Sequence, residues 1–158
     1  MAKAASRILV INDEHLVLRE FVKGLNAAAR TLDNPLGISF VGVTTAKEAL
    51  SMIEADGNLQ AVLVDDTLYT LSNNGKKGEK HPRRLQMSAL ELVQRITRFR
   101  PELDVYIVIA QEKEDDVVDA LFAESVDGYF YREERDYRGM YRILNAQIQE
   151  RARTPFYD

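Results

Sequence analysis

Short apolar runs and amphipathic stretches alternate along the whole chain. Five apolar runs have the length of strands: Ile8–Ile11, Ile38–Val43, Ala61–Val64, Val105–Ala110 and Gly128–Tyr131. Continuous runs of this kind are typical of strands that are covered on both faces, as in a parallel sheet. The pattern therefore predicts five short strands inside the molecule.

Helical periodicity fills the spaces between these strands. The residues that form one apolar stripe of the first helix, expected over His15–Ala29, are Leu16, Leu18, Phe21, Val22, Leu25 and Ala29. Further helices are expected from Thr45 to about Asp56, from Ser88 to Phe99, over Asp115–Glu124 and over Asp136–Arg151. Thr45 and Ser88 each open a capping box. Five strand–helix units predict a parallel sheet wrapped by helices on both faces.

Polar side chains directly follow two of the predicted strands. Asn12 and Asp13 come after the first strand, and Asp65 and Asp66 come after the third. If these strands are parallel neighbours, the four side chains converge at the carboxyl edge of the sheet, where open α/β sheets bind ligands. Such a cluster could coordinate Mg²⁺ or offer one aspartate as a phosphoryl acceptor. It could instead be an acidic edge satisfied by helix N-termini and water.

Composition narrows the class of protein. The chain has 158 residues, a formal net charge of -4 and no cysteine. This length fits one domain, and the lack of thiols excludes disulfides and zinc–thiolate sites and suits a reducing cytosol. The charge gives no overall attraction to nucleic acid, and no apolar run approaches the roughly 20 residues that span a bilayer. We expect a cytoplasmic domain without nucleic-acid or membrane partners.

The long segment Thr67–Gln86 interrupts the strand–helix rhythm and carries a basic cluster. Its basic residues are Lys76, Lys77, Lys80, Arg83 and Arg84. They would suit an anionic effector or an acidic partner, or they form a solvated loop. The two histidines, His15 and His81, are expected to be exposed polar residues.

Aromatic residues gather around the last predicted strand and helix. The tyrosines in this region are Tyr129, Tyr131, Tyr137 and Tyr141. Tyrosine is common both in cores and at interfaces, so these residues are either packed inside or form an assembly contact.

The order of elements, the acids after the first and third strands and the capped helices resemble a response-regulator receiver domain, from about Arg7 to Arg151. The resemblance implies a flavodoxin-like (receiver-type) fold, with three α/β/α layers around a five-stranded parallel sheet. It also implies a site. The Mg²⁺-binding acid pair of the family falls on Asn12 and Asp13, the phosphoacceptor on Asp65, the hydroxyl position on Ala110, and the lysine on Arg132.

Three of these positions depart from the family's pattern. Asn12 removes one anionic ligand, although an amide oxygen can still coordinate a cation. Ala110 cannot donate a hydrogen bond to a phosphoryl group, and Arg132 carries its charge on a longer, planar head than lysine. The sequence therefore disfavours phosphorylation, and Mg²⁺ is expected only if the domain is a working receiver.

A second resemblance is to the amino-terminal wing domain of the bacterial ornithine/lysine/arginine decarboxylases. It rests on three motifs in order, Thr45-Ala46-Lys47-Glu48-Ala49-Leu50, Ala61-Val62-Leu63-Val64-Asp65 and Asp127-Gly128-Tyr129-Phe130, and on the ending Thr154-Pro155-Phe156. The resemblance implies a wing domain over residues 1–152. Residues 153–158 would begin a linker to a catalytic region that binds pyridoxal phosphate (PLP).

From this resemblance we expect a non-catalytic domain that serves oligomer assembly or regulation of a PLP-dependent decarboxylase. It would hold no cofactor itself, and its partners would be its own catalytic region and other subunits of a homo-oligomer. Two alternatives stay open: a receiver domain phosphorylated on Asp65 with Mg²⁺, and a free-standing adaptor with the receiver fold.

Overall fold

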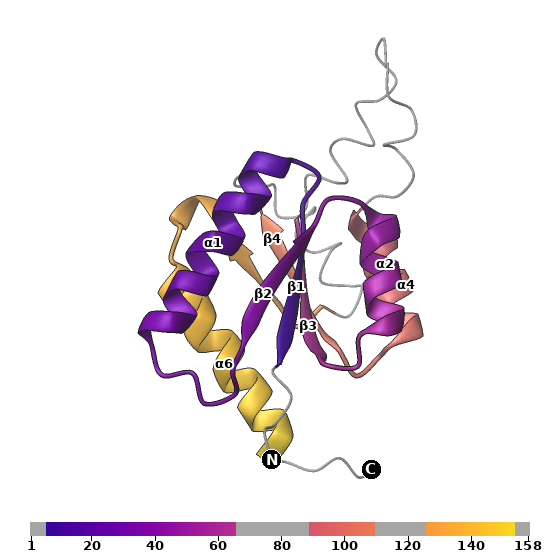
Figure 1. Cartoon of the computed structure of the whole chain (residues 1–158). Helices are drawn as coiled ribbons and strands as arrows, with labels where there is room; N and C mark the ends of the chain where they lie inside the picture. Colours follow the sequence, from indigo (N-terminus) through magenta and orange to yellow (C-terminus); the bar gives the residue numbers. More distant parts are fainter. Residues whose placement is uncertain (1–5, 66–88, 110–125, 154–158) are drawn as a thin grey trace.

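The computed structural model describes residues 6–65, 89–109 and 126–153, which are built around one parallel sheet (Figure 1). Its five strands are β1 (Arg7–Ile11), β2 (Ser39–Val43), β3 (Leu59–Asp65), β4 (Asp104–Ile109) and β5 (Gly128–Tyr131). They lie in the order β2-β1-β3-β4-β5, and every neighbouring pair is parallel. The first and third strands are therefore neighbours, as the convergence of their polar ends requires.

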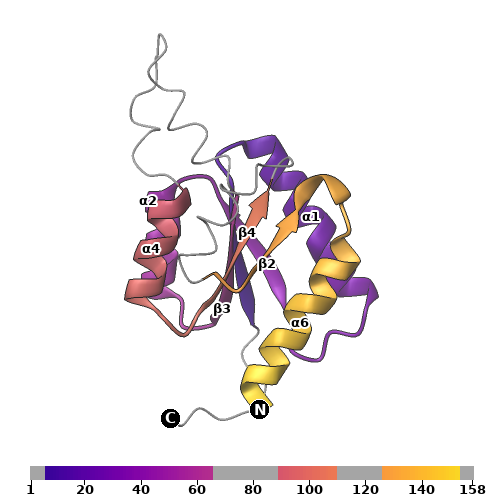
Figure 2. The same ribbon diagram turned by 180° about the vertical axis from the view of Figure 1, so that it is seen from behind.

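Helices cover both faces of the sheet. α1 (His15–Thr31) and α6 (Tyr137–Arg153) pack on one face, and α2 (Ala46–Ala55) and α4 (Ala89–Phe99) pack on the other (Figure 2). A short 3-10 helix, η2 (Arg132–Glu134), connects β5 to α6. The flavodoxin-like, receiver-type α/β/α fold predicted from the sequence is confirmed. The helix expected over 115–124 and the long segment 67–86 lie outside the described residues.

The alternation of side chains along each strand divides the core into two halves. In β1, Ile8 and Val10 belong to the half under α1 and α6, whereas Leu9 and Ile11 belong to the half under α2 and α4. All four side chains are at most 2% exposed. A strand buried on both faces has no solvent-facing side, which is why its sequence is continuously apolar.

Local signals set the boundaries of α2. Thr45 caps this helix, because its hydroxyl oxygen accepts a hydrogen bond from the Glu48 backbone N–H at 3.0 Å. The Glu48 carboxylate reaches back to the backbone N–H of Thr44 at 3.3 Å, one residue earlier than in the usual capping box. The helix ends at Ala55, immediately before the predicted stop at Asp56 and Gly57.

One residue of the predicted apolar stripe of α1 is placed differently. Leu16 is 73% exposed, whereas Leu18 and Phe21 are buried. Two positions along a helix correspond to a rotation of about 200°, so Leu16 and Leu18 cannot face the same side. The prediction for Leu16 was wrong because it treated too broad an arc of the helix as buried. Within the described ranges, no helix is long and apolar enough to cross a membrane.

Candidate functional site

The carboxyl edge of the sheet brings together three residues singled out from the sequence. Asn12 follows β1, Asp65 ends β3, and Arg132 follows β5. The Asn12 Nδ2 atom donates a hydrogen bond to Asp65 Oδ2 at 2.8 Å. An Arg132 guanidinium nitrogen donates to the same oxygen at 2.7 Å. These three residues, here called the Asp65 network, tie three strands of the sheet together at one carboxylate.

The Asp65 network lies inside the protein. The Asp65 side chain is 3% exposed and that of Arg132 is 20% exposed, and Asn12 is buried. A carboxylate in such a place must be paired and hydrogen-bonded to remain charged. Arg132 supplies the opposite charge and Asn12 supplies a further donor, so the fold contains its own counter-ion for Asp65.

Two hydrogen bonds fix which way the Asn12 amide points. Its Oδ1 atom accepts from the backbone N–H of Glu14 at 2.8 Å, and its Nδ2 atom donates to Asp65. Exchanging the two ends would put oxygen against the Asp65 oxygen and N–H against N–H, so the orientation is set by the chemistry of both partners. The amide therefore presents a donor, and not a cation-binding oxygen, toward Asp65.

Asp13, the other member of the predicted acid pair, follows Asn12 in the chain and is half-buried. Asp13 and Asp65 are the carboxylates here that could hold a cation. No group of three or more histidine, aspartate or glutamate side chains within the described ranges is arranged to hold a metal ion. Asp66, Ala110 and the basic cluster Lys76, Lys77, Lys80, Arg83 and Arg84 lie outside the described residues.

The four tyrosines near the end of the chain occupy different environments. Tyr129 is 39% exposed and packs edge-on against Tyr131, with ring centroids 5.4 Å apart. Tyr137 contacts Phe21 of α1 in an edge arrangement. Tyr141 is 1% exposed and belongs to the core. Of this set, Tyr129 is the most open to a partner, Tyr131 is partly buried against the core half under α2 and α4, and Tyr141 is buried.

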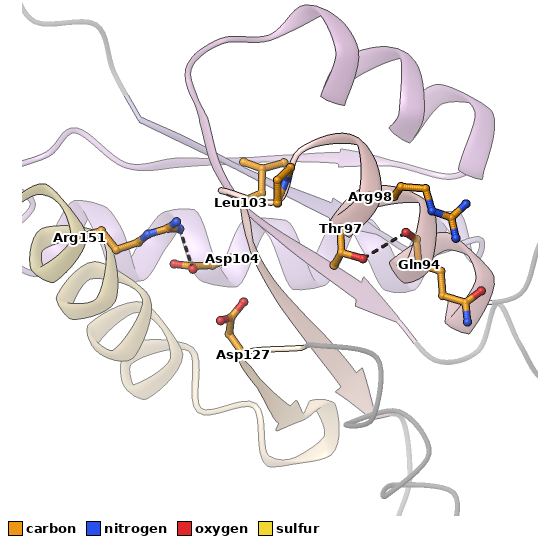
Figure 3. A pocket seen from close by; sticks show the side chains of 8 residues that line it. Gln94, Thr97, Arg98, Leu103, Asp104, Asp127 and Arg151 are labelled. Atoms are coloured by element: carbon orange, nitrogen blue, oxygen red, sulfur yellow. Dashed lines mark hydrogen bonds and ion pairs between the residues drawn. The ribbon is translucent and has the colours of Figure 1, made fainter. Parts of the chain in front are cut away.

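A second buried aspartate lies at the opposite, amino-terminal edge of the sheet. Asp104 begins β4 and is 7% exposed. One of its oxygens accepts a hydrogen bond from Arg151 of α6 at 2.7 Å, and the other is buried without a hydrogen-bond partner. Figure 3 shows Asp104 lying between Arg151 and Asp127, at one side of a cavity of about 640 Å³.

The electrostatics of Asp104 follow from this setting. Burial raises the pKa of Asp104 to about 6, the Arg151 guanidinium opposes the rise, and the Asp127 carboxylate adds to it. Asp127 joins the start of β5 to β4, because its carboxylate accepts a hydrogen bond from the backbone N–H of Val105 at 2.7 Å. Asp104 was not among the residues singled out from the sequence, where this strand was expected to begin one residue later, at Val105.

Comparisons with known proteins agree on the fold. No family model matches the chain, and no curated protein matches it. Solved structures match closely in shape. A CheY-like receiver domain protein from Methanospirillum hungatei JF-1 has a TM-score of 0.67 at 17% identity, covering 95% of this chain and 98% of its own. A receiver domain protein from Clostridium thermocellum has a TM-score of 0.65 at 19% identity, covering 93% and 97%.

The chain has the receiver fold. Other matching structures are a BeF3-activated DrrB receiver domain, with a TM-score of 0.63 at 17% identity and coverage of 94% of this chain and 100% of the other, and an orphan response regulator of H. pylori. The latter has a TM-score of 0.63 at 18% identity, covering 93% of this chain and 99% of its own. At these identities the likeness is one of fold.

These matches overturn the prediction of a decarboxylase wing domain. The matching structures are CheY-like receiver domains and response regulators, and nothing among them points to a PLP-dependent decarboxylase. The motifs that suggested one have local structural causes. Thr45 is a helix cap, Ala61–Val64 is a strand buried on both faces, and Asp127 binds the backbone of β4. Each of these residues has a structural role within the fold, so they do not by themselves identify one branch of it.

Proposed function

We propose that this chain is a receiver-type signalling domain of the response-regulator class that works through protein contacts, with Asp65 held in an ion pair instead of being phosphorylated. The observation that carries the proposal is the Asp65 network. Asp65 stands where a receiver has its phosphoacceptor, and a single oxygen of its carboxylate accepts from both Arg132 and Asn12, at 2.7 and 2.8 Å.

The geometry of the network opposes phosphoryl transfer in two ways. Attack by Asp65 on a phosphodonor requires an accessible carboxylate, and this one is 3% exposed. A bound Mg²⁺ requires oxygen ligands, and Asn12 turns its N–H₂ group toward Asp65. Arg132 already supplies the positive charge that a cation would bring. The resting state is thus stabilised by the protein's own side chains.

A receiver phosphorylated on Asp65 with Mg²⁺ is the second candidate. It is favoured by Asp13, which directly follows Asn12 in the chain, and by the fold shared with a BeF3-activated receiver domain. In this case Arg132 would leave Asp65 and contact the phosphoryl oxygens, as a planar guanidinium does well. The two candidates differ in one measurable property, the reactivity of Asp65.

Labelling with acetyl phosphate separates the two candidates. The chain is incubated with acetyl phosphate and Mg²⁺, and its intact mass is measured. We expect no phosphoryl adduct on the wild type.

In an N12D/R132K variant, which restores the acid pair and the lysine, Mg²⁺ binding should strengthen because a carboxylate ligand has been added. Stoichiometric, Mg²⁺-dependent labelling of the wild type that disappears in Asp65→Asn would establish the second candidate.

The surface to which we assign the protein contacts is formed by β5 and α6. Tyr129 is 39% exposed and Ile143 is 50% exposed, and both line a cavity of about 260 Å³ together with Met140. Exposed aromatic and aliphatic side chains next to a hollow are suited to anchoring a partner. We assign the protein contacts of this signalling domain to Tyr129, Tyr131 and Ile143. We place the domain in the cytoplasm.

A further inference from the structure

The outer edge of the sheet at β2 is closed by side chains. β2 is the first strand in the order β2-β1-β3-β4-β5, so one of its sides has no neighbouring strand. An edge strand normally leaves a row of unpaired N–H and C=O groups, which can pair with another chain. The β2 residues whose backbone N–H and C=O groups do not point toward β1 direct these groups outward.

The backbone hydrogen bonds between β2 and β1 show this direction. The Ser39 N–H donates to the Ser6 carbonyl at 3.0 Å, and the Val43 carbonyl accepts from the Asn12 N–H at 3.2 Å. Ser39 and Val43 therefore direct their backbone groups toward β1. Because alternate residues of a parallel strand pair on the same side, Phe40 directs its N–H and C=O away from the sheet.

A single asparagine of α1 satisfies both outward groups of Phe40. The Asn26 Nδ2 atom donates to the Phe40 carbonyl at 3.1 Å, and the Phe40 N–H donates to Asn26 Oδ1 at 2.8 Å. A carboxamide carries the same donor and acceptor as a peptide group. Asn26 thus makes the pair of hydrogen bonds that a neighbouring strand would make. Asparagine has a low helix propensity, and Asn26 lies in the middle of α1. The two hydrogen bonds to Phe40 offset this cost.

A second asparagine repeats the arrangement two residues earlier. The Asn34 Nδ2 atom donates to the Ile38 carbonyl at 3.1 Å, and the Ile38 N–H donates to Asn34 Oδ1 at 2.9 Å. The hydroxyl of Tyr141 lies 2.7 Å from the Asp33 carbonyl and 2.9 Å from the same Oδ1 atom, and its one proton is shared between these two acceptors, which holds the amide against α6. The buried Tyr141 thereby helps to hold the Asn34 amide in place at this edge.

The last outward position of β2 is Gly42, which is exposed, and α1 covers the face of the sheet in front of it. A Cβ atom at Gly42 would lie 2.9 Å from the Leu18 side chain. Figure 1 shows α1 lying beside β2. The outward groups of Phe40 in β2, and of Ile38 just before it, are therefore bonded by amides, whereas α1 meets Gly42 on a face of the sheet.

We propose that Asn26 and Asn34 act as surrogate strands that close the β2 edge, and that loss of the Asn26 clamp lets a second copy of the chain add its own β2 there. The occupant is a second copy because its β2 exposes the same two groups, so that an antiparallel pair of β2 strands is self-complementary about a two-fold axis. In the wild type these clamps oppose association by strand pairing at this edge.

The test is the oligomeric state of an Asn26→Leu variant. Leucine has nearly the same shape, favours helix and cannot form either hydrogen bond. We expect the weight-average mass in sedimentation velocity to rise with concentration toward twice that of the wild type measured alongside. Asn145→Leu is the matched control, because Asn145 is also a helical asparagine and its Oδ1 atom has no hydrogen-bond partner. This control should behave like the wild type.

A double variant distinguishes edge pairing from association through unfolding. Asn26→Leu combined with Val41→Lys places a charge on β2, which opposes strand pairing without restoring the clamp. We expect the double variant to return to the wild-type mass. Hydrogen exchange at the Phe40 amide should be faster in dilute Asn26→Leu than in wild type, and should slow as concentration rises.

Two results would overturn the proposal. One is an Asn26→Leu protein that keeps the wild-type mass at every concentration. The other is association that persists unchanged in the Val41→Lys double variant, because it would then not pass through β2. If Asn26→Leu does not fold, Asn34→Ala removes the second clamp and is judged by the same measurements.

Discussion

Two aspartates are buried at opposite edges of the same sheet, and each is hydrogen-bonded to an arginine at 2.7 Å. Asp65 at the carboxyl edge also accepts from Asn12. Asp104 at the amino edge has one oxygen buried without a partner and a second carboxylate, Asp127, nearby. Distance to an arginine is therefore the same in both cases, and the difference lies in what surrounds the pair.

This comparison shows that an ion pair does not by itself make a buried acid stable in its charged form. The cost of removing a carboxylate from water is offset only when its remaining lone pairs are also satisfied. At Asp65 the amide of Asn12 contributes to this. At Asp104 one carboxylate oxygen has no donor, and burial raises the pKa of this group to about 6 in spite of Arg151. The same chemical pair is thus joined by an amide donor at one edge and left with an unsatisfied carboxylate oxygen at the other.

The largest expected effect comes from removing the arginine of the Asp65 network. Arg132→Leu leaves a carboxylate that is 3% exposed without its counter-ion. We expect the free energy of unfolding to fall by about 3–5 kcal/mol, measured by urea denaturation at neutral pH. Adding Asp65→Asn to this variant should recover much of the loss, because the uncompensated charge is removed.

Arg151→Leu is the matched control for this prediction. The Arg151 side chain is 43% exposed, and Asp104 can take up a proton when its partner is removed. The loss of stability should therefore be clearly smaller than for Arg132→Leu. Equal losses in the two variants would contradict the distinction between the two edges.

The second effect is a pH dependence that belongs to Asp104. Its folded pKa of about 6 lies above the ordinary value of 3.8, so the folded state binds the proton more tightly than the unfolded state. Stability from this group is therefore lost as pH rises from about 4 to about 6, by about 3 kcal/mol over the whole window. The penalty is fully present above that window.

Asp104→Asn isolates this contribution from the other titrating groups. The difference in unfolding free energy between wild type and variant should change across the window and be constant above pH 7. Other acids act in the opposite direction, since the Arg7 hydrogen bond lowers the pKa of Asp56. A difference that stays constant from pH 4 to pH 7 would show that Asp104 titrates as an ordinary surface acid.

The smallest effect concerns Asp127. In Asp127→Asn the side-chain oxygen can still accept from the Val105 N–H, while the negative charge near Asp104 is removed. We expect the pKa of Asp104 to fall by a fraction of a unit, followed by the NMR titration of its carboxyl carbon. A rise in this pKa, or no change, would mean that Asp127 does not act through its charge.

Much of the fold could be predicted from the sequence, because its signals are local. The bounds of β5, Gly128–Tyr131, were predicted residue for residue, and the Thr45 cap placed the start of α2. Errors arose where packing decides between similar residues. Leu16 and Leu18 have the same side chain, yet only the second faces the sheet.

The candidate site was predicted in part. The sequence located Asn12, Asp65 and Arg132 at strand ends, and the parallel order of the strands made their approach expected. It could not show that the Asn12 amide turns its nitrogen to Asp65, because this depends on the backbone N–H of Glu14. Nor could it find the clamp of Asn26 on Phe40, since nothing in the sequence of a helix shows which edge strand it accompanies.

The sequence by itself determined the five-stranded α/β architecture and the edge at which its polar strand ends gather, because hydrophobic period and helix caps act over a few residues. The tertiary structure alone decided the state of the two buried aspartates. Their partners stand far away in the chain, 53 positions for Asn12 and Asp65, 67 for Asp65 and Arg132, and 47 for Asp104 and Arg151. Whether a buried carboxylate is satisfied depends on which donors folding brings within hydrogen-bonding distance.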